Sequence, residues 1–160
     1  MKIANIIKLV VSCAVPLLVG VTGSLFTTAD SLSNWYAKLN KPPFNPPDWI
    51  FGPVWTTLYI MMGISAFIIW RKGLDDKVIR IALSCFIVQL FFNAIWTPLF
   101  FGLRSPLLGL IDIVLLLNAI IVTIYVFSKI SRPAALLLIP YLAWVSFATV
   151  LNASLYLLNR

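Results

Sequence analysis

The chain has 160 residues, of which 61% are hydrophobic and 11% charged, and its mean hydropathy is +1.00. A soluble domain carries about 25% charged residues, so this composition excludes an ordinary water-soluble protein. The formal charge is +7, and the sequence contains neither histidine nor glutamate. Without these residues, His-ligated zinc or haem, Ser-His-Asp hydrolysis and glutamate proton relays are excluded. We therefore expect no hydrolytic or metal-dependent chemistry and no required cofactor.

Long uncharged segments organise the chain. There are five such segments: 9–29, 49–70, 81–103, 105–128 and 133–159. The segment 105–128 contains one charge, Asp112, and the other four contain none. About 20 apolar residues in a helix cross the hydrocarbon of a bilayer, so each segment is long enough to span once. The sequence predicts an all-α membrane bundle in one domain, 1–160, with a 30–46 loop as lid and spans at about 5–27, 47–70, 79–102, 105–128 and 133–158.

Lysine and arginine are unevenly shared between the two predicted sides of the membrane. The side of the amino terminus holds eight of them: Lys2, Lys8, Arg71, Lys72, Lys77, Arg80, Lys129 and Arg132. The other side holds Lys38, Lys41, Arg104 and Arg160. Because short cytoplasmic loops are enriched in basic residues, we expect a cytoplasmic amino terminus and an external carboxyl terminus. A positive cytoplasmic rim also accounts for the basic charge without a nucleic-acid partner.

The first long connection combines aromatic residues with proline. A short helix carrying Trp35 and Tyr36 is expected first, and two Pro-Pro pairs, the first beginning at Pro42, then hold the chain extended. In the following span Trp49 and Trp70 lie at the two ends, as interfacial tryptophans do.

Three faces of the predicted bundle carry large or polar side chains where lipid-facing helices carry leucine. They are Trp55, Tyr59 and Met62 in the second span; Gln89, Asn93, Trp96 and Phe100 in the third; and Pro140, Trp144, Phe147, Ala148, Leu151 and Asn152 in the fifth. Amides are not satisfied by lipid, so these faces are expected to point inward. Spacing alone leaves two alternatives for the amides, contacts between helices or contacts with a ligand.

Asp112 is the one acid inside a predicted span. An ionisable group at that position is a functional hypothesis by default. The alternative, which we favour, is that its carboxylate accepts hydrogen bonds from neighbouring amides or hydroxyls.

The motifs as a whole resemble the tryptophan-rich sensory protein family, also called the translocator protein or peripheral-type benzodiazepine receptor family. The resemblance covers about residues 15–155 and rests on Trp35-Tyr36, Lys41-Pro42-x-Phe44-x-Pro46-Pro47-x-Trp49-x-Phe51-Gly52-x-Val54-Trp55-Thr56-x-Leu58-Tyr59, Gln89 to Gly102, Asp112-Ile-Val and Pro140 to Asn152. It implies five helices, the same number that the uncharged segments predict.

The resemblance also implies a ligand and a role. It points to porphyrins such as protoporphyrin IX, bound inside the bundle for tetrapyrrole sensing, transport or regulation, in a homodimer of a prokaryotic cell membrane. The predicted ligand site consists of Trp35, Tyr36, Pro42, Trp55, Gln89, Asn93, Trp96, Trp144, Phe147 and Ala148. The basic residues Lys38 and Lys41 stand near it as possible partners of porphyrin carboxylates or as solvated loop charges.

Two further functions remain open. Relatives in the family are implicated in light- and oxygen-dependent porphyrin breakdown, and the resemblance would make Trp55 and Trp144 the catalytic residues of such an activity. Sterol binding or transport is another possibility, with Leu151, Tyr156 and Arg160 matching a loose sterol-contact pattern. A purely structural membrane subunit is the interpretation without a ligand.

Overall fold

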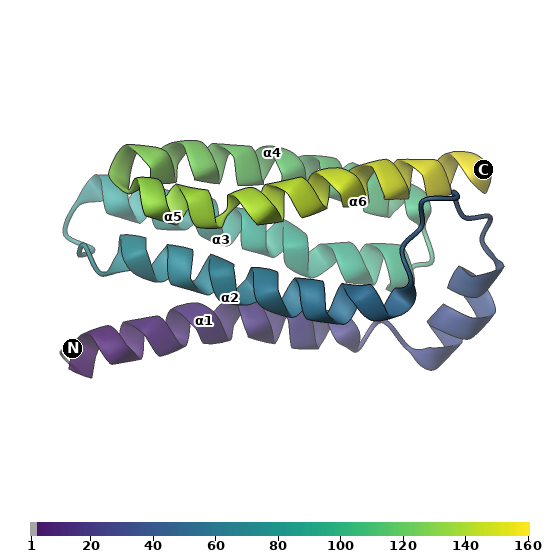
Figure 1. Ribbon diagram of the computed structural model, residues 1–160, viewed down its shortest axis with the longest axis horizontal. Helices are drawn as coiled ribbons and strands as arrows, with labels where there is room; N and C mark the ends of the chain where they lie inside the picture. The colour runs from purple at the N-terminus through teal and green to yellow at the C-terminus, as the bar shows by residue number, and fades with distance from the viewer. Residues whose placement is uncertain (1–2) are drawn as a thin grey trace.

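The bundle consists of long apolar helices that lie roughly along one axis (Figure 1). The computed structural model describes residues 3–160, and Lys2 of the charge count lies outside them. Within these residues five helical segments are long and apolar enough to cross a membrane, which confirms the expected all-α bundle of five spans. The helices are α1 Ile3–Ser24, α2 Phe51–Trp70, α3 Lys77–Thr97, α4 Pro106–Ile130, α5 Arg132–Leu137 and α6 Ile139–Leu158.

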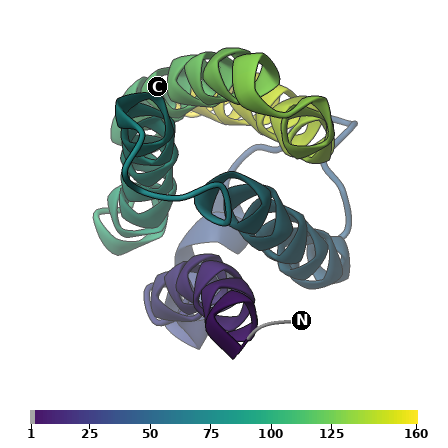
Figure 2. The same cartoon turned by 90° about the vertical axis from the view of Figure 1, so that its left-hand side faces the viewer.

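The helices close around a common core, with α1 at the edge. In the end view α1 lies apart from α4 and packs against α2 and α3 (Figure 2). Helix α4 packs against α3, α5 and α6, and α2 against α5. The core side chains Met62, Leu116 and Tyr141 come from α2, α4 and α6, so three separate spans share one buried interior.

Local sequence signals set where α3 and α4 begin. The side chain of Asp76 accepts a hydrogen bond from the backbone N–H of Val78, 2.8 Å away, and caps α3. Ser105 caps α4 in the same way through the N–H of Leu108, and Pro106 occupies the first turn, where no donor is needed.

Two prolines interrupt spans that the sequence predicts as continuous. The segment expected at 133–158 is two helices, because Pro140 has no N–H to continue the helical ladder and its ring crowds the preceding turn. At the end of α3, Pro98 starts a π-helical turn, η4 Pro98–Gly102, closed by the N–H of Leu103 on the carbonyl of Pro98 at 2.8 Å. The π turn carries Phe100 and Phe101 toward the interior of the bundle.

The connection between α1 and α2, residues 25–47, is called the lid below. It contains the π-helical turn η1 Ser31–Trp35 and the 3-10 turn η2 Tyr36–Lys38, and a further 3-10 turn, η3 Asp48–Ile50, leads into α2. The lid crosses the end of the bundle at which the carboxyl terminus lies (Figure 1).

Candidate functional site

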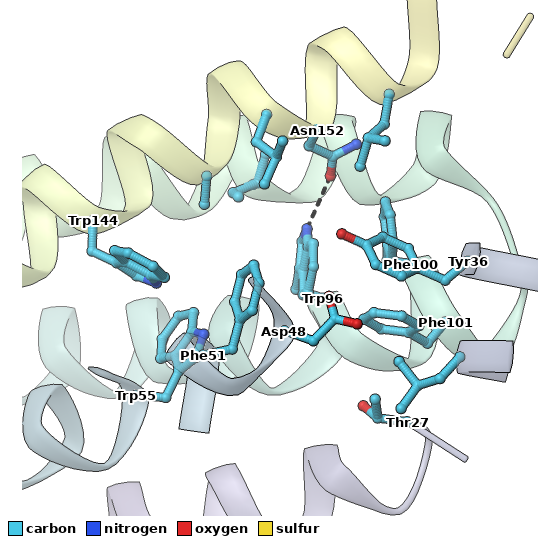
Figure 3. A pocket seen from close by; sticks show the side chains of 15 residues that line it. Thr27, Tyr36, Asp48, Phe51, Trp55, Trp96, Phe100, Phe101, Trp144 and Asn152 are labelled. Carbon is cyan, nitrogen blue, oxygen red and sulfur yellow. Dashed lines mark hydrogen bonds between the residues drawn. The ribbon is translucent and has the colours of Figure 1, made fainter. Parts of the chain in front are cut away.

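A cavity of about 260 Å³ lies under the lid, between α2, α3, α4 and α6, and it is partly open. We call it the aromatic cavity. Its fifteen lining residues are Thr27, Leu32, Tyr36, Asp48, Phe51, Trp55, Trp96, Phe100, Phe101, Ile113, Trp144, Ala148, Leu151, Asn152 and Leu155. Figure 3 shows the labelled rings converging on one space from different elements.

Ring contacts fix the aromatic walls against one another. Trp96 and Phe100 stack with centroids 4.9 Å apart and 14° between their planes, which the π turn after Pro98 makes possible. On the opposite side Phe51 meets Trp144 edge-on at 5.8 Å. Each such pair adds about 0.5–1.5 kcal/mol beyond burial, so the walls hold their shape without a ligand.

The wall formed by α6 combines a small side chain with an unused donor. Ala148 lies one turn after Trp144 and leaves space between the larger rings. The indole Nε1 of Trp144 is buried and has no hydrogen-bond partner among residues 3–160. A buried N–H without an acceptor is costly, so an acceptor on a bound molecule would remove that cost.

The indole of Trp96 differs, because it is satisfied by the protein itself. Its Nε1 donates to Asn152 Oδ1 at 3.2 Å (Figure 3). Asn152 Nδ2 in turn donates to the carbonyl of Pro106 at 2.8 Å. These two bonds join α3, α4 and α6 at the end of the cavity nearest the lid.

The lid has one internal hydrogen bond and is joined to the rest of the bundle at two places. Tyr36 Oη donates to Asn45 Oδ1 at 3.1 Å within the lid. Asn40 and Asn159 are paired across 119 residues: the Asn40 N–H donates to Asn159 Oδ1 at 2.9 Å and Asn159 Nδ2 donates to the Asn40 carbonyl at 3.0 Å. Asp30 and Arg104 form an exposed ion pair at 2.5 Å.

Two lid groups have pKa values shifted by their surroundings. A hydrogen bond from Asn34, joined by the charge of Arg104, lowers the pKa of Asp30. Burial raises the pKa of Tyr36, the nearby Asp48 carboxylate raises it further, and the hydrogen bond to Asn45 acts in the opposite direction.

Half of the residues predicted for the ligand site line the cavity, and half do not. Tyr36, Trp55, Trp96, Trp144 and Ala148 are in its wall. Trp35 and Phe147 pack behind the wall in the same cluster. Pro42 is buried in the lid and is not among the lining residues.

Gln89 and Asn93 lie outside the lining of the cavity. Tyrosines of neighbouring helices bind the amide oxygens of both residues and Nδ2 of Asn93, while Nε2 of Gln89 is buried without a partner among residues 3–160. Tyr59 Oη donates to Asn93 Oδ1 at 2.9 Å, Asn93 Nδ2 donates to Tyr141 Oη at 2.9 Å, and Tyr141 Oη donates to Gln89 Oε1 at 3.0 Å. We call these four residues the amide–tyrosine network. Of the two alternatives that spacing leaves for the amides, the structure shows contacts between helices.

The sequence missed several lining residues for identifiable reasons. Thr27 and Leu32 lie outside the motifs, and the motifs that contain Phe51 and Phe101 do not indicate that these rings reach the cavity. Their positions there depend on the course of the lid and on the π turn. Phe100 and Asn152 lie on the faces expected to point inward, and that signal could have placed both in the site.

Asp112 does not have the expected role as a hydrogen-bond acceptor. The residue is 3% exposed, and neither carboxylate oxygen has a hydrogen-bond partner in the described part of the chain.

The residues of the sterol-contact pattern do not form one surface. Leu151 lines the cavity while Arg160 is exposed, so Leu151, Tyr156 and Arg160 do not share one outward surface.

Comparison with known proteins gives the family of this chain. The model of the TspO/MBR family matches residues 12–157. The chain belongs to the TspO/MBR family. It is 47% identical to the tryptophan-rich protein TspO of Archaeoglobus fulgidus, over 97% of this chain and 99% of that protein. It is 40% identical to the translocator protein of Bos taurus, over 91% and 86% of the two chains. It is also 35% identical to the tryptophan-rich sensory protein of Cereibacter sphaeroides, over 78% and 77%.

Family membership and the five apolar spans together make the chain an integral membrane protein. The family model begins inside α1 and ends in α6, so it includes the lid and every wall of the cavity.

Proposed function

We propose that this membrane protein binds porphyrins and related flat, largely apolar molecules in the aromatic cavity, for tetrapyrrole sensing, transport or regulation. The observation that carries the proposal is the cavity itself: rings from α2, α3, the π turn, α6 and the lid surround open space beside Ala148, and Nε1 of Trp144 in the wall has no partner among residues 3–160. Ligand sites are typically concave and apolar with a few polar groups, which is the composition of these walls.

Titration with protoporphyrin IX tests the proposal. Trp55, Trp96 and Trp144 line the cavity, so a bound porphyrin would quench the tryptophan fluorescence of the purified protein in saturable fashion. Ala148→Leu fills the space next to Trp144 and should weaken the quenching, while Ala143→Leu, on the exposed side of α6, serves as the control. A flat titration of the wild-type protein would contradict the proposal and favour a structural subunit.

A second candidate is light- and oxygen-dependent breakdown of the bound porphyrin. Trp55 is favourably placed for it, because its ring stacks on Tyr59 at 5.4 Å and so two oxidisable rings adjoin at the cavity wall. In this mechanism light excites the porphyrin, an indole of Trp55 or Trp144 gives it an electron, and dioxygen is the oxidant. Illumination of the loaded protein should consume porphyrin, and Trp55→Phe and Trp144→Phe should slow the loss without abolishing binding. Normal consumption by both variants would exclude the indole relay.

The proposal includes the orientation and assembly expected from the sequence. With the amino terminus cytoplasmic, the lid and the cavity mouth would face outward, and ligands would enter from that side. Labelling of a cysteine introduced at exposed Lys38 by an impermeant reagent in intact cells tests this orientation. A homodimer in a prokaryotic cell membrane completes the proposal, and cross-linking in native membranes tests the dimer.

A further inference from the structure

Among the lining residues within 3–160, Asp48 is the one that carries a charge at neutral pH. We propose that Asp48 selects ligands by charge: the cavity favours flat molecules that present an uncharged, N–H-bearing or cationic edge to the lid end and disfavours those that present carboxylates there. This inference rests on the proposed function, because it concerns the ligand of the same cavity.

Asp48 is an exposed residue that lines the cavity, and its backbone is held at the start of a helix. It begins η3, directly before α2, and proline at position 47 sets the backbone there. A carboxylate at the amino end of a helix interacts favourably with the helix dipole, which stabilises Asp48 in this place. The salt bridge found in residues 3–160 joins Asp30 to Arg104, so the Asp48 carboxylate is free of an ion-pair partner there.

The charge of Asp48 acts across the lid end of the cavity. Tyr36 stands in the wall formed by the lid, and the Asp48 carboxylate contributes, after burial, to the raised pKa of the Tyr36 hydroxyl. Figure 3 shows Asp48 among the rings that line this end. A ligand between the two residues would experience the same negative potential, which solvent screens in part because Asp48 is exposed.

Lys41 is a competing charge, because it contacts the ring of Tyr36. Its Nζ lies 4.1 Å from the centroid of the Tyr36 ring, and Lys41 is not among the lining residues. Part of its field is therefore directed at the ring face. A ligand edge inside the cavity can adjoin Asp48, which lines the space, whereas Lys41 does not line it.

The opposite end of the cavity has the reverse polarity. The unpaired Nε1 of Trp144 is a donor in the wall of α6, deeper in the span than Asp48. The two ends define a ligand class: a flat, mostly apolar molecule with a hydrogen-bond acceptor at one end and a donor or positive group at the other. A molecule of this class satisfies both polar groups at once.

A matched pair of probes measures the charge selection. Protoporphyrin IX, a diacid, and its uncharged dimethyl ester share one macrocycle, and both are titrated into the protein in nanodiscs of neutral lipid. We expect the wild-type protein to prefer the ester and Asp48→Asn to shift the affinity ratio toward the diacid by about fivefold, the upper range for an exposed charge. Asp48→Ser should give a shift in the same direction. Because variants and wild type share one lipid, partition of the probes into the bilayer cancels in the ratio.

Asp75→Asn is the control, since it removes the same charge from an exposed loop at the other end of the bundle and should leave the ratio within about twofold. An unchanged ratio in both Asp48 variants overturns the charge selection and leaves the proposed function standing. A wild-type preference for the diacid that Lys41→Gln abolishes overturns it as well, with Lys41 then the selecting group. If neither probe binds the folded wild-type protein, the proposed function fails together with the inference.

Discussion

The amide–tyrosine network and the aromatic cavity are made of similar side chains, and they differ in how the bundle satisfies them. In the network, Tyr59, Asn93, Tyr141 and Gln89 form a chain of three hydrogen bonds across α2, α3 and α6. Only Nε2 of Gln89 is left without a partner in the described residues, and Gln89 does not line the cavity. In the cavity, Trp144 keeps an unused donor and Asp48 an unpaired charge within residues 3–160. Polar groups that neighbouring helices satisfy stabilise the fold, whereas groups left open beside space are available to a ligand.

Close packing separates the two regions as well. Gly63, next to the network on α2, faces the backbone of α1 so closely that an added Cβ would lie 2.5 Å from the Cα of Cys13. Around Ala148 the rings of the cavity leave open volume instead. Substitutions in the first region are therefore expected to change stability, and substitutions in the second to change ligand affinity.

The largest effect is expected from Gly63→Val, which forces α1 away from α2. Overpacking against backbone atoms should lower the free energy of unfolding by about 3 kcal/mol. Thermal unfolding in detergent measures the loss. Gly52→Ala is the control, because a Cβ added at Gly52 would have nothing within 4 Å and alanine favours a helix. Equal melting temperatures for the two variants would contradict the close approach of the helices.

Tyr141→Phe breaks the network at its centre. It leaves the Asn93 amide and Gln89 Oε1 buried without their shared partner, and should cost about 1–3 kcal/mol of stability. Porphyrin affinity should stay within about twofold, since Tyr141 does not line the cavity. Tyr125→Phe removes a hydroxyl from a ring that is 62% exposed and should leave the melting temperature unchanged. A tenfold affinity loss at full stability would place the network in the ligand site.

Ala148→Leu should change ligand affinity and leave stability intact, the reverse of the effect expected for Tyr141→Phe. The added atoms occupy open volume next to Trp144, so ligand affinity should fall at least about tenfold while the melting temperature holds or rises slightly. Isothermal titration and thermal unfolding on one preparation separate the two effects. Unaltered affinity would show that the ligand binds elsewhere.

Asn159→Ala removes the side chain that joins α6 to the lid at Asn40. Two hydrogen bonds between ordered segments are lost, so the lid should open more often and the dissociation rate of the ligand should rise by roughly three- to tenfold. Stopped-flow displacement measures this rate. Asn118→Ala, whose amide bonds to its own helix on the exposed side of α4, is the matched control.

The smallest effect concerns pH and the ion pair between Asp30 and Arg104. Since the folded pKa of Asp30 is below its ordinary value, the stabilisation is complete above the ordinary range of aspartate and is lost as the pH falls through the lowered value. Ligand dissociation should therefore be constant from pH 7 to about pH 5 and accelerate slightly only below about pH 4. Asp30→Asn should abolish this acid-dependent step, and an unchanged step would assign it to another group.

The sequence predicts the spans well because a membrane helix depends on composition and length alone. Each long segment overlaps one of the five spans, and Asp76 and Ser105 mark where α3 and α4 begin. The sequence does not predict the interruptions at Pro98 and Pro140, because a proline within a hydrophobic run can kink, break or begin a helix, depending on its neighbours.

The candidate site was only half predictable, and the tryptophans show why. Helical spacing correctly turns Trp55, Trp96 and Trp144 inward, and Trp49, 74% exposed, fits a lipid-facing position near the membrane surface. The same spacing turns Gln89 and Asn93 inward without revealing that Tyr59 and Tyr141 lie there as partners. Spacing gives the direction of a side chain, and the partner depends on the height at which another helix crosses it.

By itself, the sequence determined the membrane environment, the number of spans, their inward faces and, through its motifs, the family. These properties follow from local composition and from periodicity along single helices. Only the tertiary structure decided that Phe51, Phe101 and Asp48 belong to the cavity and that Gln89 and Asn93 do not. Those assignments depend on the register between helices and on the course of the lid, both of which arise from packing between residues far apart in the chain.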